Sequence, residues 1–74
     1  MRPELREILT NVLEVKSITE RDSAETIPTW DSVRHLTLIT AIEERFDILF
    51  DADQMLSLTS VSAIVDALNG HAPS

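Results

Sequence analysis

The sequence predicts an all-α fold: a small antiparallel four-helix bundle of three longer helices and one short helix, with a long loop between the first two helices. Three segments repeat apolar residues with the 3.6-residue period of a helix, and a shorter segment begins with a capping sequence. The composition agrees, because the chain has one glycine and few aromatic residues but many Leu, Ile, Ala and Glu. We expect one small domain spanning residues 1–74.

The first helix is predicted at about residues 2–15. Pro3 suits the first turn of a helix, where a missing N–H costs nothing, and Glu4 suits the positive N-terminal end. One face then carries apolar side chains at helical spacing: Leu5, Ile8, Leu9, Val12 and Leu13.

A polar connection follows at residues 16–29, and it is longer than most loops in compact domains. We expect an ordered surface loop that Ile18, Ile27 and Trp30 attach to the core. A short helical turn between residues 19 and 25 is compatible with the sequence.

The second helix is predicted at about residues 32–46, and its two faces differ. We expect one face to join the core, with Leu38 on its flank; this face carries Leu36, Ile39, Ile42 and Phe46. The opposite side carries a mixed stripe: Val33, Thr37, Thr40 and Glu44. A solvated face rarely begins with valine, so the stripe is a candidate contact surface. A helix end with one stray apolar residue explains it equally well.

A short third helix is predicted at about residues 51–57. Asp47 ends the second helix, and three apolar residues are then expected to return to the core: Ile48, Leu49 and Phe50. Asp51, with Gln54 three residues later, has the spacing of a capping box. The residues expected to face inward from this segment are Met55, Leu56 and Leu58.

The last helix is predicted at about residues 60–69, with Thr59 as its N-cap. Its apolar residues recur at helical spacing: Val61, Ile64, Val65 and Leu68. Gly70 suits the C-terminal end, and residues 71–74 are expected to form a frayed tail.

The chain is acidic, with 13 acidic and 6 basic residues and a formal net charge of −7. A nucleic-acid-binding protein needs a positive surface to displace counterions, so we expect no nucleic-acid partner. The charge either serves solubility alone or directs the protein to basic patches on partners. No signal peptide or membrane-spanning run is apparent, and cysteine is absent, so we expect a protein of the reducing cytoplasm that binds no membrane. We also expect a monomer.

Asp31, Ser32 and His35 resemble a catalytic triad only in composition. Side chains one and three positions apart at a helix start cannot place the base between nucleophile and acid. The chain also has too little glycine to build an oxyanion hole. We therefore expect no catalytic residue, and we expect His35 to pack beside Trp30 or to reach solvent.

Metal sites are not predicted either. Asp51 and Asp53 resemble the start of a calcium-binding EF-hand loop, but Leu56 and Ser62 stand where that loop needs glycine and a bidentate acid. Two histidines without cysteine do not make a structural zinc site.

Ser32 is a candidate for phosphate attachment, because it lies where a helix emerges from a loop. The free N–H groups and the positive dipole end of a helix stabilise a phosphate placed there. Serine at a helix start is more often only a cap, so the position alone does not decide between the two roles.

The chain resembles the acyl carrier proteins. The likeness rests on Asp31-Ser32-Val33, similar to the family's Asp-Ser-Leu motif, preceded by Trp30 and followed at matching spacing by residues of the second helix: Leu36, Leu38, Ile39, Ala41, Ile42, Glu43, Glu44, Phe46, Asp47 and Ile48. Thr59-Ser60-Val61 resembles the Thr-Thr-Val that opens the family's last helix. The likeness extends over essentially the whole chain.

The resemblance implies a non-catalytic carrier. Ser32 matches the serine to which a phosphopantetheinyl transferase attaches 4′-phosphopantetheine from coenzyme A, and Asp31 matches the acid expected to help position that transfer. The arm's thiol would carry an acyl group as a thioester to enzymes such as a ketosynthase or an acyltransferase. The resemblance places partner recognition on the stripe, with Glu43 beside it: Val33, Thr37, Thr40, Glu43 and Glu44. It places a short acyl chain against Leu36, Ile39 and Phe46.

Some residues depart from the family pattern. Val33 replaces the usual leucine, Arg34 stands where many members have an acid, and Thr37 and Thr40 are milder than the residues often found there. These departures leave open a fatty acid, polyketide or related pathway and a carrier of aminoacyl groups. The rival from another class is a small acidic helical interaction module without a prosthetic group, in which Ser32 is only a cap.

Overall fold

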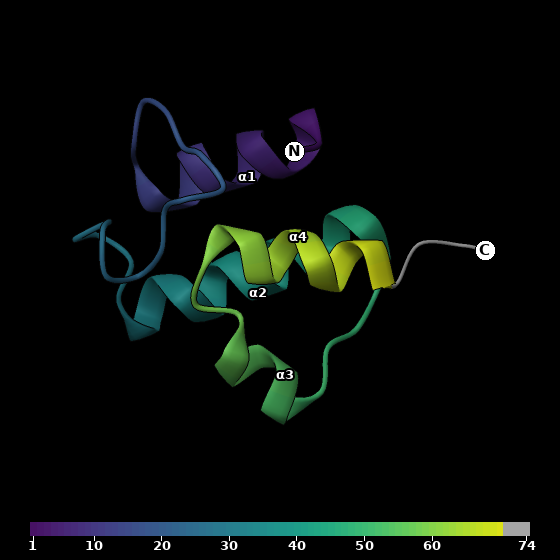
Figure 1. The fold of residues 1–74 in the computed structure, drawn as a ribbon. Coiled ribbons are helices and arrows are strands. Elements are labelled where there is room, and N and C mark those ends of the chain that lie inside the picture. Colours follow the sequence, from purple (N-terminus) through teal and green to yellow (C-terminus); the bar gives the residue numbers. More distant parts are fainter. Residues whose placement is uncertain (71–74) are drawn as a thin grey trace.

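A computed structural model describes residues 1–70, which form four helices (Figure 1). These are α1 (Pro3–Leu13), α2 (Ser32–Phe46), α3 (Ala52–Ser57) and α4 (Val61–Gly70). No strand occurs in this part of the chain, apart from one isolated bridge between Ser23 and Ser60. The predicted all-α fold is confirmed, while the predicted tail at residues 71–74 lies outside the described residues.

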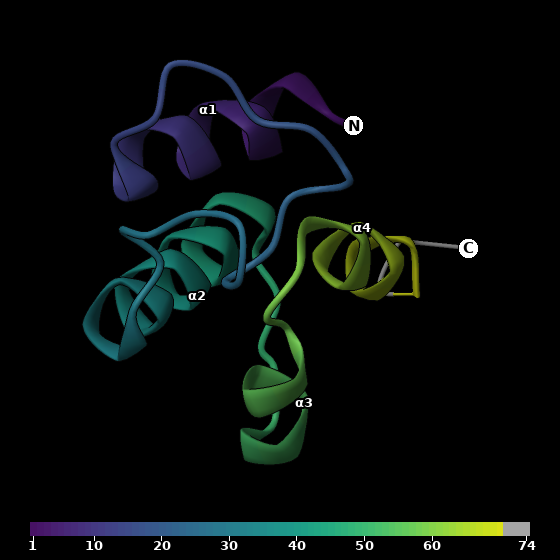
Figure 2. The ribbon, with the colours of Figure 1, turned by 60° about the vertical axis from the view of Figure 1, so that its left-hand side comes forward.

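The three longer helices enclose the core, and α3 lies to one side of them (Figures 1 and 2). α1 and α2 run in opposite directions and form the most extensive helix pair. The core is entirely apolar over the described residues: Leu5, Leu9, Leu13, Ile18, Ile27, Trp30, Leu38, Ile39, Ile42, Phe50, Leu58, Val61, Ile64 and Leu68. The start of α1 and the end of α2 also meet, because the Arg2 guanidinium lies 5.5 Å from the ring centroid of Phe46, a cation–π contact.

α1 and α2 both end on a left-handed residue. Glu14 has φ 57°, and it donates with Val15 to the carbonyl of Thr10; Asp47 has φ 53° and closes α2 in the same way on Glu43. Such a residue cannot continue a right-handed helix, so α1 stops at Leu13 and not near residue 15 as predicted. The left-handed conformation costs a non-glycine residue roughly 1–2 kcal/mol, which the closed last turns must offset.

The connection from α1 to α2 is attached to the core at the three predicted positions, since Ile18, Ile27 and Trp30 are all buried. It contains turns and no helix between residues 19 and 25. The backbone N–H of Thr19 donates to the Asp22 carboxylate at 2.9 Å, and this bond holds the pKa of Asp22 below its ordinary value. The bridge to Ser60 ties the same turn to the start of α4.

Three leucines were expected in the core and are exposed. Leu36 is 61% exposed, Leu49 82% and Leu56 75%, so these three predictions are wrong. On α2 the buried residues are Leu38, Ile39 and Ile42. At 100° per residue these three span an arc of about 100°, and Leu36 lies about 60° beyond its edge. The packed arc is therefore centred closer to Leu38 than the apolar spacing suggested.

The two later helices are capped by side chains. Asp51 accepts a hydrogen bond from the backbone N–H of Gln54 at 2.7 Å, which confirms the predicted cap of α3. At α4 the cap is Ser60, whose hydroxyl accepts from Ala63 N–H at 3.1 Å, and the prediction of Thr59 is wrong. Thr59 contributes its carbonyl instead, which accepts from the Ala24 N–H in the loop.

Candidate functional site

Ser32 is the first residue of α2, and its side chain is exposed. The cap of α2 is Asp31, which has extended backbone and whose Oδ1 accepts from Arg34 N–H at 2.9 Å. The Ser32 hydroxyl makes no hydrogen bond within residues 1–70. The interpretation of Ser32 as a cap is therefore wrong, and its hydroxyl is available for other chemistry.

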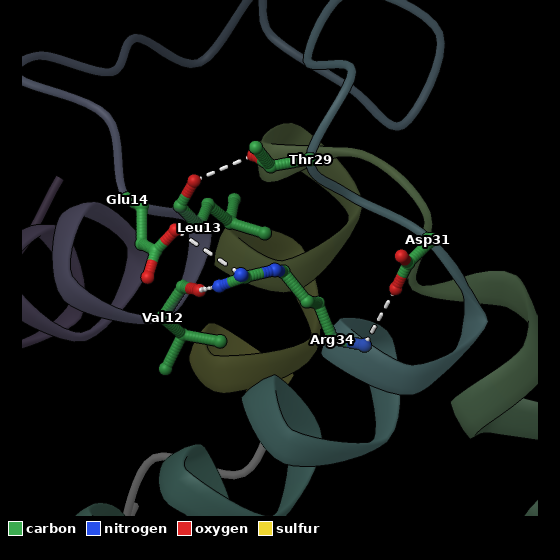
Figure 3. A network of polar contacts seen from close by, with 6 residues as sticks. All are labelled: Val12, Leu13, Glu14, Thr29, Asp31 and Arg34. Carbon is green, nitrogen blue, oxygen red and sulfur yellow. Dashed lines mark hydrogen bonds and ion pairs between the residues drawn. The ribbon is translucent and has the colours of Figure 1, made fainter.

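A network of polar contacts fixes this helix start to the end of α1 (Figure 3). The Arg34 guanidinium reaches across to α1, where it donates to the carbonyl of Val12 at 2.6 Å and pairs with the Glu14 carboxylate at 3.1 Å. The Thr29 hydroxyl donates to the carbonyl of Leu13 at 2.5 Å. The last carbonyls of a helix lack partners within that helix, so these bonds satisfy α1 and position α2 together.

His35 connects the loop, α2 and α3. The Trp30 indole N–H donates to Nδ1 of His35 at 3.1 Å, and the two rings stack with centroids 6.3 Å apart. An indole N–H can only donate, so Nδ1 accepts and the proton resides on Nε2. Nε2 then donates to the carbonyl of Met55 in α3 at 2.7 Å. The predicted packing of His35 beside Trp30 is confirmed.

The same arrangement removes His35 from acid–base chemistry at Ser32. Both ring nitrogens are engaged by partners other than Ser32, so His35 is not placed to accept a proton from that hydroxyl. The described residues contain no group of three or more acidic, histidine or cysteine side chains that could hold a metal ion. Over the same residues, no helix is long and apolar enough to cross a membrane.

An open cavity of about 480 Å³ lies beside Ser32. Residues of the loop, the first turns of α2, α3 and the start of α4 surround it: Ala24, Trp30, Asp31, Ser32, His35, Leu36, Leu56 and Thr59. Its surface is mostly apolar, and the exposed leucines of α2 and α3 both contribute to it. Sequence reasoning missed this cavity because it assigned Leu36 and Leu56 to the core.

The predicted stripe on α2 is exposed along its whole length, beginning with Val33 at 73%. Thr37 and Thr40 each donate their hydroxyl proton to the carbonyl four residues earlier, so they offer a partner acceptors and methyl groups. Glu44 is exposed, whereas Glu43 is half-buried and accepts a hydrogen bond from Phe50 N–H at 2.8 Å. Glu43 thus supports the loop after α2 as well as bordering the stripe.

The core acyl site expected from the resemblance is only partly assembled. Ile39 is buried and Phe46 is half-buried, but Leu36 faces the cavity beside Ser32.

Arg34 directs its charge toward α1, which explains how the chain has a basic residue at this position without making the stripe basic.

Comparison with solved structures gives a close relative in architecture and sequence. The solution NMR structure of a holo acyl carrier protein from Geobacter metallireducens superposes with a TM-score of 0.79 at 30% identity, covering 93% of this chain and 85% of that chain. No protein-family model and no curated protein sequence matches the chain. Similarity at this identity, over nearly the full length of both chains, establishes common membership together with the shared fold. The chain belongs to the acyl carrier protein family.

Proposed function

We propose that this protein carries an acyl group as a thioester on a 4′-phosphopantetheine arm attached to Ser32. The observation that supports this most directly concerns the start of α2. Asp31 caps the helix, and the neighbouring Ser32 hydroxyl is exposed and makes no hydrogen bond within residues 1–70. The holo state of the Geobacter relative supports the same assignment. The pathway we propose is fatty acid, polyketide or related secondary metabolism.

The residues around Ser32 fit a phosphodiester. The backbone N–H groups of Ser32 and Val33 make no hydrogen bond within residues 1–70, and they lie at the positive end of the α2 dipole. Such N–H groups are suitable partners for phosphate oxygens. Attachment would form a bond between Ser32 Oγ and phosphorus and break the pyrophosphate of coenzyme A. Adenosine 3′,5′-bisphosphate leaves, and the transferase takes the hydroxyl proton.

The chain's own part in transport is attachment, orientation and recognition. When bound, the arm supplies the thiol that forms the thioester. We propose that Asp31 holds Ser32 at the helix start for the phosphopantetheinyl transferase, through its bond to Arg34. The partner surface we propose is the exposed stripe with its neighbouring acid: Val33, Thr37, Thr40, Glu43 and Glu44. An acidic rim favours fast, salt-sensitive encounters with basic surfaces on acyl-loading and acyl-processing enzymes.

The test is enzymatic modification followed by intact-mass measurement. The purified protein is incubated with coenzyme A and a broad-specificity phosphopantetheinyl transferase, alongside Ser32→Ala and Ser17→Ala. Ser17 is a matched control, because it is also exposed and makes no hydrogen bond within residues 1–70. We expect wild type and Ser17→Ala to gain one phosphopantetheinyl group and Ser32→Ala to gain none.

Circular dichroism establishes that both variants keep their helices. Modification of folded Ser32→Ala would move the attachment elsewhere. No gain by the wild type would contradict the carrier function and favour the interaction module without a prosthetic group.

A further inference from the structure

His35 needs a neutral ring for one of its two hydrogen bonds. Nδ1 accepts the indole N–H of Trp30 at 3.1 Å, and Nε2 donates to the carbonyl of Met55 at 2.7 Å. Histidine is the side chain that ordinarily gains or loses a proton between about pH 5 and 8. The proposed function gives this half-buried, titratable ring no role, although one proton decides which bonds it can make.

A second ring proton acts differently on the two bonds. The imidazolium form carries a hydrogen on both nitrogens and can accept none. Nδ1–H then faces the indole N–H, so the bond from Trp30 is lost and two donors oppose each other. Nε2 keeps its hydrogen, so the bond to Met55 persists and becomes charge-assisted. Protonation of His35 therefore detaches the loop and leaves α3 attached.

The indole of Trp30 has no second acceptor to turn to. Trp30 is 5% exposed, and within residues 1–70 its indole N–H donates to His35 alone. A buried donor without an acceptor is destabilising, so the indole must move until it reaches water or another partner. Stacking does not replace the bond, because the ring centroids lie 6.3 Å apart, at the limit of cation–π attraction.

The segment from Trp30 to His35 contains Ser32 and is closed at both ends. The backbone N–H of His35 donates to the carbonyl of Asp31 at 2.8 Å within the first turn of α2. The side-chain bond between Trp30 and His35 joins the same two ends across five positions. A shift of the indole therefore acts on the two residues that follow it, Asp31 and Ser32.

The charged groups around His35 come from α2 and α3. Asp31 lines the same cavity and offers an anionic group to a protonated Nδ1, whereas Arg34 is directed to α1. At the start of α3, the Asp51 carboxylate caps the helix, and Asp53 is exposed. The cavity residues from the loop and the start of α4 carry no titratable group: Ala24, Trp30 and Thr59. Asp31 is thus the charged group available to His35.

We propose that His35 is a positioning residue for Ser32 and that a single proton switches its action. The inference deepens the proposed function and rests on it. With the ring neutral, the indole bond fixes Trp30, and the chain passes from there through Asp31 directly to Ser32. With the ring protonated, Trp30 is released, and the hydroxyl is presented from a less ordered helix start. His35 acts through Trp30 and does not touch the reacting atoms.

The first measurement follows the indole N–H of Trp30 by NMR in the unmodified protein, from about pH 8 to about pH 5. The sequence has one tryptophan, so the spectrum contains one indole signal. At the upper pH we expect a signal shifted downfield and protected from exchange with water. As the pH falls, it should move upfield and lose protection, with the same midpoint as the ring protons of His35.

Two variants assign this response, because the sequence has two histidines, His35 and His71. His71→Gln is the matched control and should keep the full response. In His35→Gln, the amide oxygen can accept from Trp30 and the amide nitrogen can donate to Met55, but the side chain does not titrate. We expect the indole signal of His35→Gln to stay constant over the whole range.

The second measurement is the rate of Ser32 modification by the transferase with coenzyme A. Division by the rate of His35→Gln at each pH removes the transferase's own pH dependence. For wild type and His71→Gln, we expect this ratio to fall severalfold between about pH 8 and about pH 6. The fall should appear in KM more than in kcat, because protonation alters how Ser32 is presented and leaves the chemical step unchanged.

The outcomes separate this inference from the proposed function. An indole signal that stays fixed while His35 titrates, or that moves equally in His35→Gln, overturns the switch. A constant ratio of rates beside the expected NMR response overturns the positioning role. If the wild type gains no mass at all, the proposed function and the positioning role fall together, while the NMR titration still shows whether the proton moves Trp30.

Discussion

Arg34→Ala tests the connection between the end of α1 and the start of α2. The Arg34 guanidinium is about two-thirds shielded, with its side chain 34% exposed, and it bonds to both Val12 and Glu14. A hydrogen bond from a charged donor contributes about 1.5–3 kcal/mol. An exposed ion pair such as that with Glu14 contributes about 0–1 kcal/mol. Partial exposure favours the lower values, so we expect Arg34→Ala to lower the free energy of unfolding by about 2 kcal/mol.

The assay is urea unfolding at constant pH, followed by helical circular dichroism and by Trp30 fluorescence. In thermal unfolding of a domain of this size, a loss of about 2 kcal/mol lowers Tm by about 8–16 °C. Glu14→Gln isolates the ion pair and should cost at most about 1 kcal/mol. Because the charge of Arg34 is directed to α1, Arg34→Ala should leave the rate of Ser32 modification unchanged at temperatures where it is folded.

Two results would refute this reasoning. A loss below about 0.5 kcal/mol for Arg34→Ala would mean that the carbonyl of Val12 is equally well satisfied by water. An equal loss for Glu14→Gln would mean that the ion pair, and not the bond to the carbonyl, joins the two helices.

Two further predictions concern acidic groups. The backbone N–H of Thr19 holds the pKa of Asp22 below its ordinary value, so the stability that Asp22 contributes is present above the pKa of its unfolded form and is lost as pH falls through the lower, folded pKa. Urea midpoints should therefore show a wild-type advantage over Asp22→Asn that shrinks below about pH 4, and a constant advantage would contradict the assignment. Glu44→Lys should slow Ser32 modification without loss of stability. Glu43→Gln should lower the urea midpoint, because it weakens the hydrogen bond that Glu43 accepts from Phe50 N–H. The reverse pattern would disprove the assignment of Glu44 to partner contact and of Glu43 to stability.

Helix positions follow well from the sequence because their determinants are local. The apolar repeats, the Asp51 cap and the start of α2 at Ser32 depend on residues within a turn or two of each other. The same local signals show which side chains share a face. They do not show how far the neighbouring helices extend around that face, and this is why Leu36 was placed in the core.

The polar contacts beneath the candidate site were beyond sequence reasoning. Arg34 meets Val12 across 22 positions, and His35 meets Met55 across 20. Neither partner is marked by side-chain chemistry, because both accept through backbone carbonyls. Trp30 beside His35 was predictable, since only five positions separate the two residues along the chain. The distinction between Asp31 as cap and Ser32 as exposed hydroxyl is visible only in the structure, because either residue type suits either role.

The bonds between the end of α1 and the residues around Ser32 also bear on how the chain folds. Thr29 and Leu13 are 16 positions apart, and Arg34 and Val12 are 22. Contacts at such short separations close small loops, so their entropic cost is low and they form readily. The α1–loop–α2 unit, which contains the most extensive helix pair, is therefore suited to serve as the folding nucleus. The segment that presents Ser32 would then be built by the earliest structure in the chain.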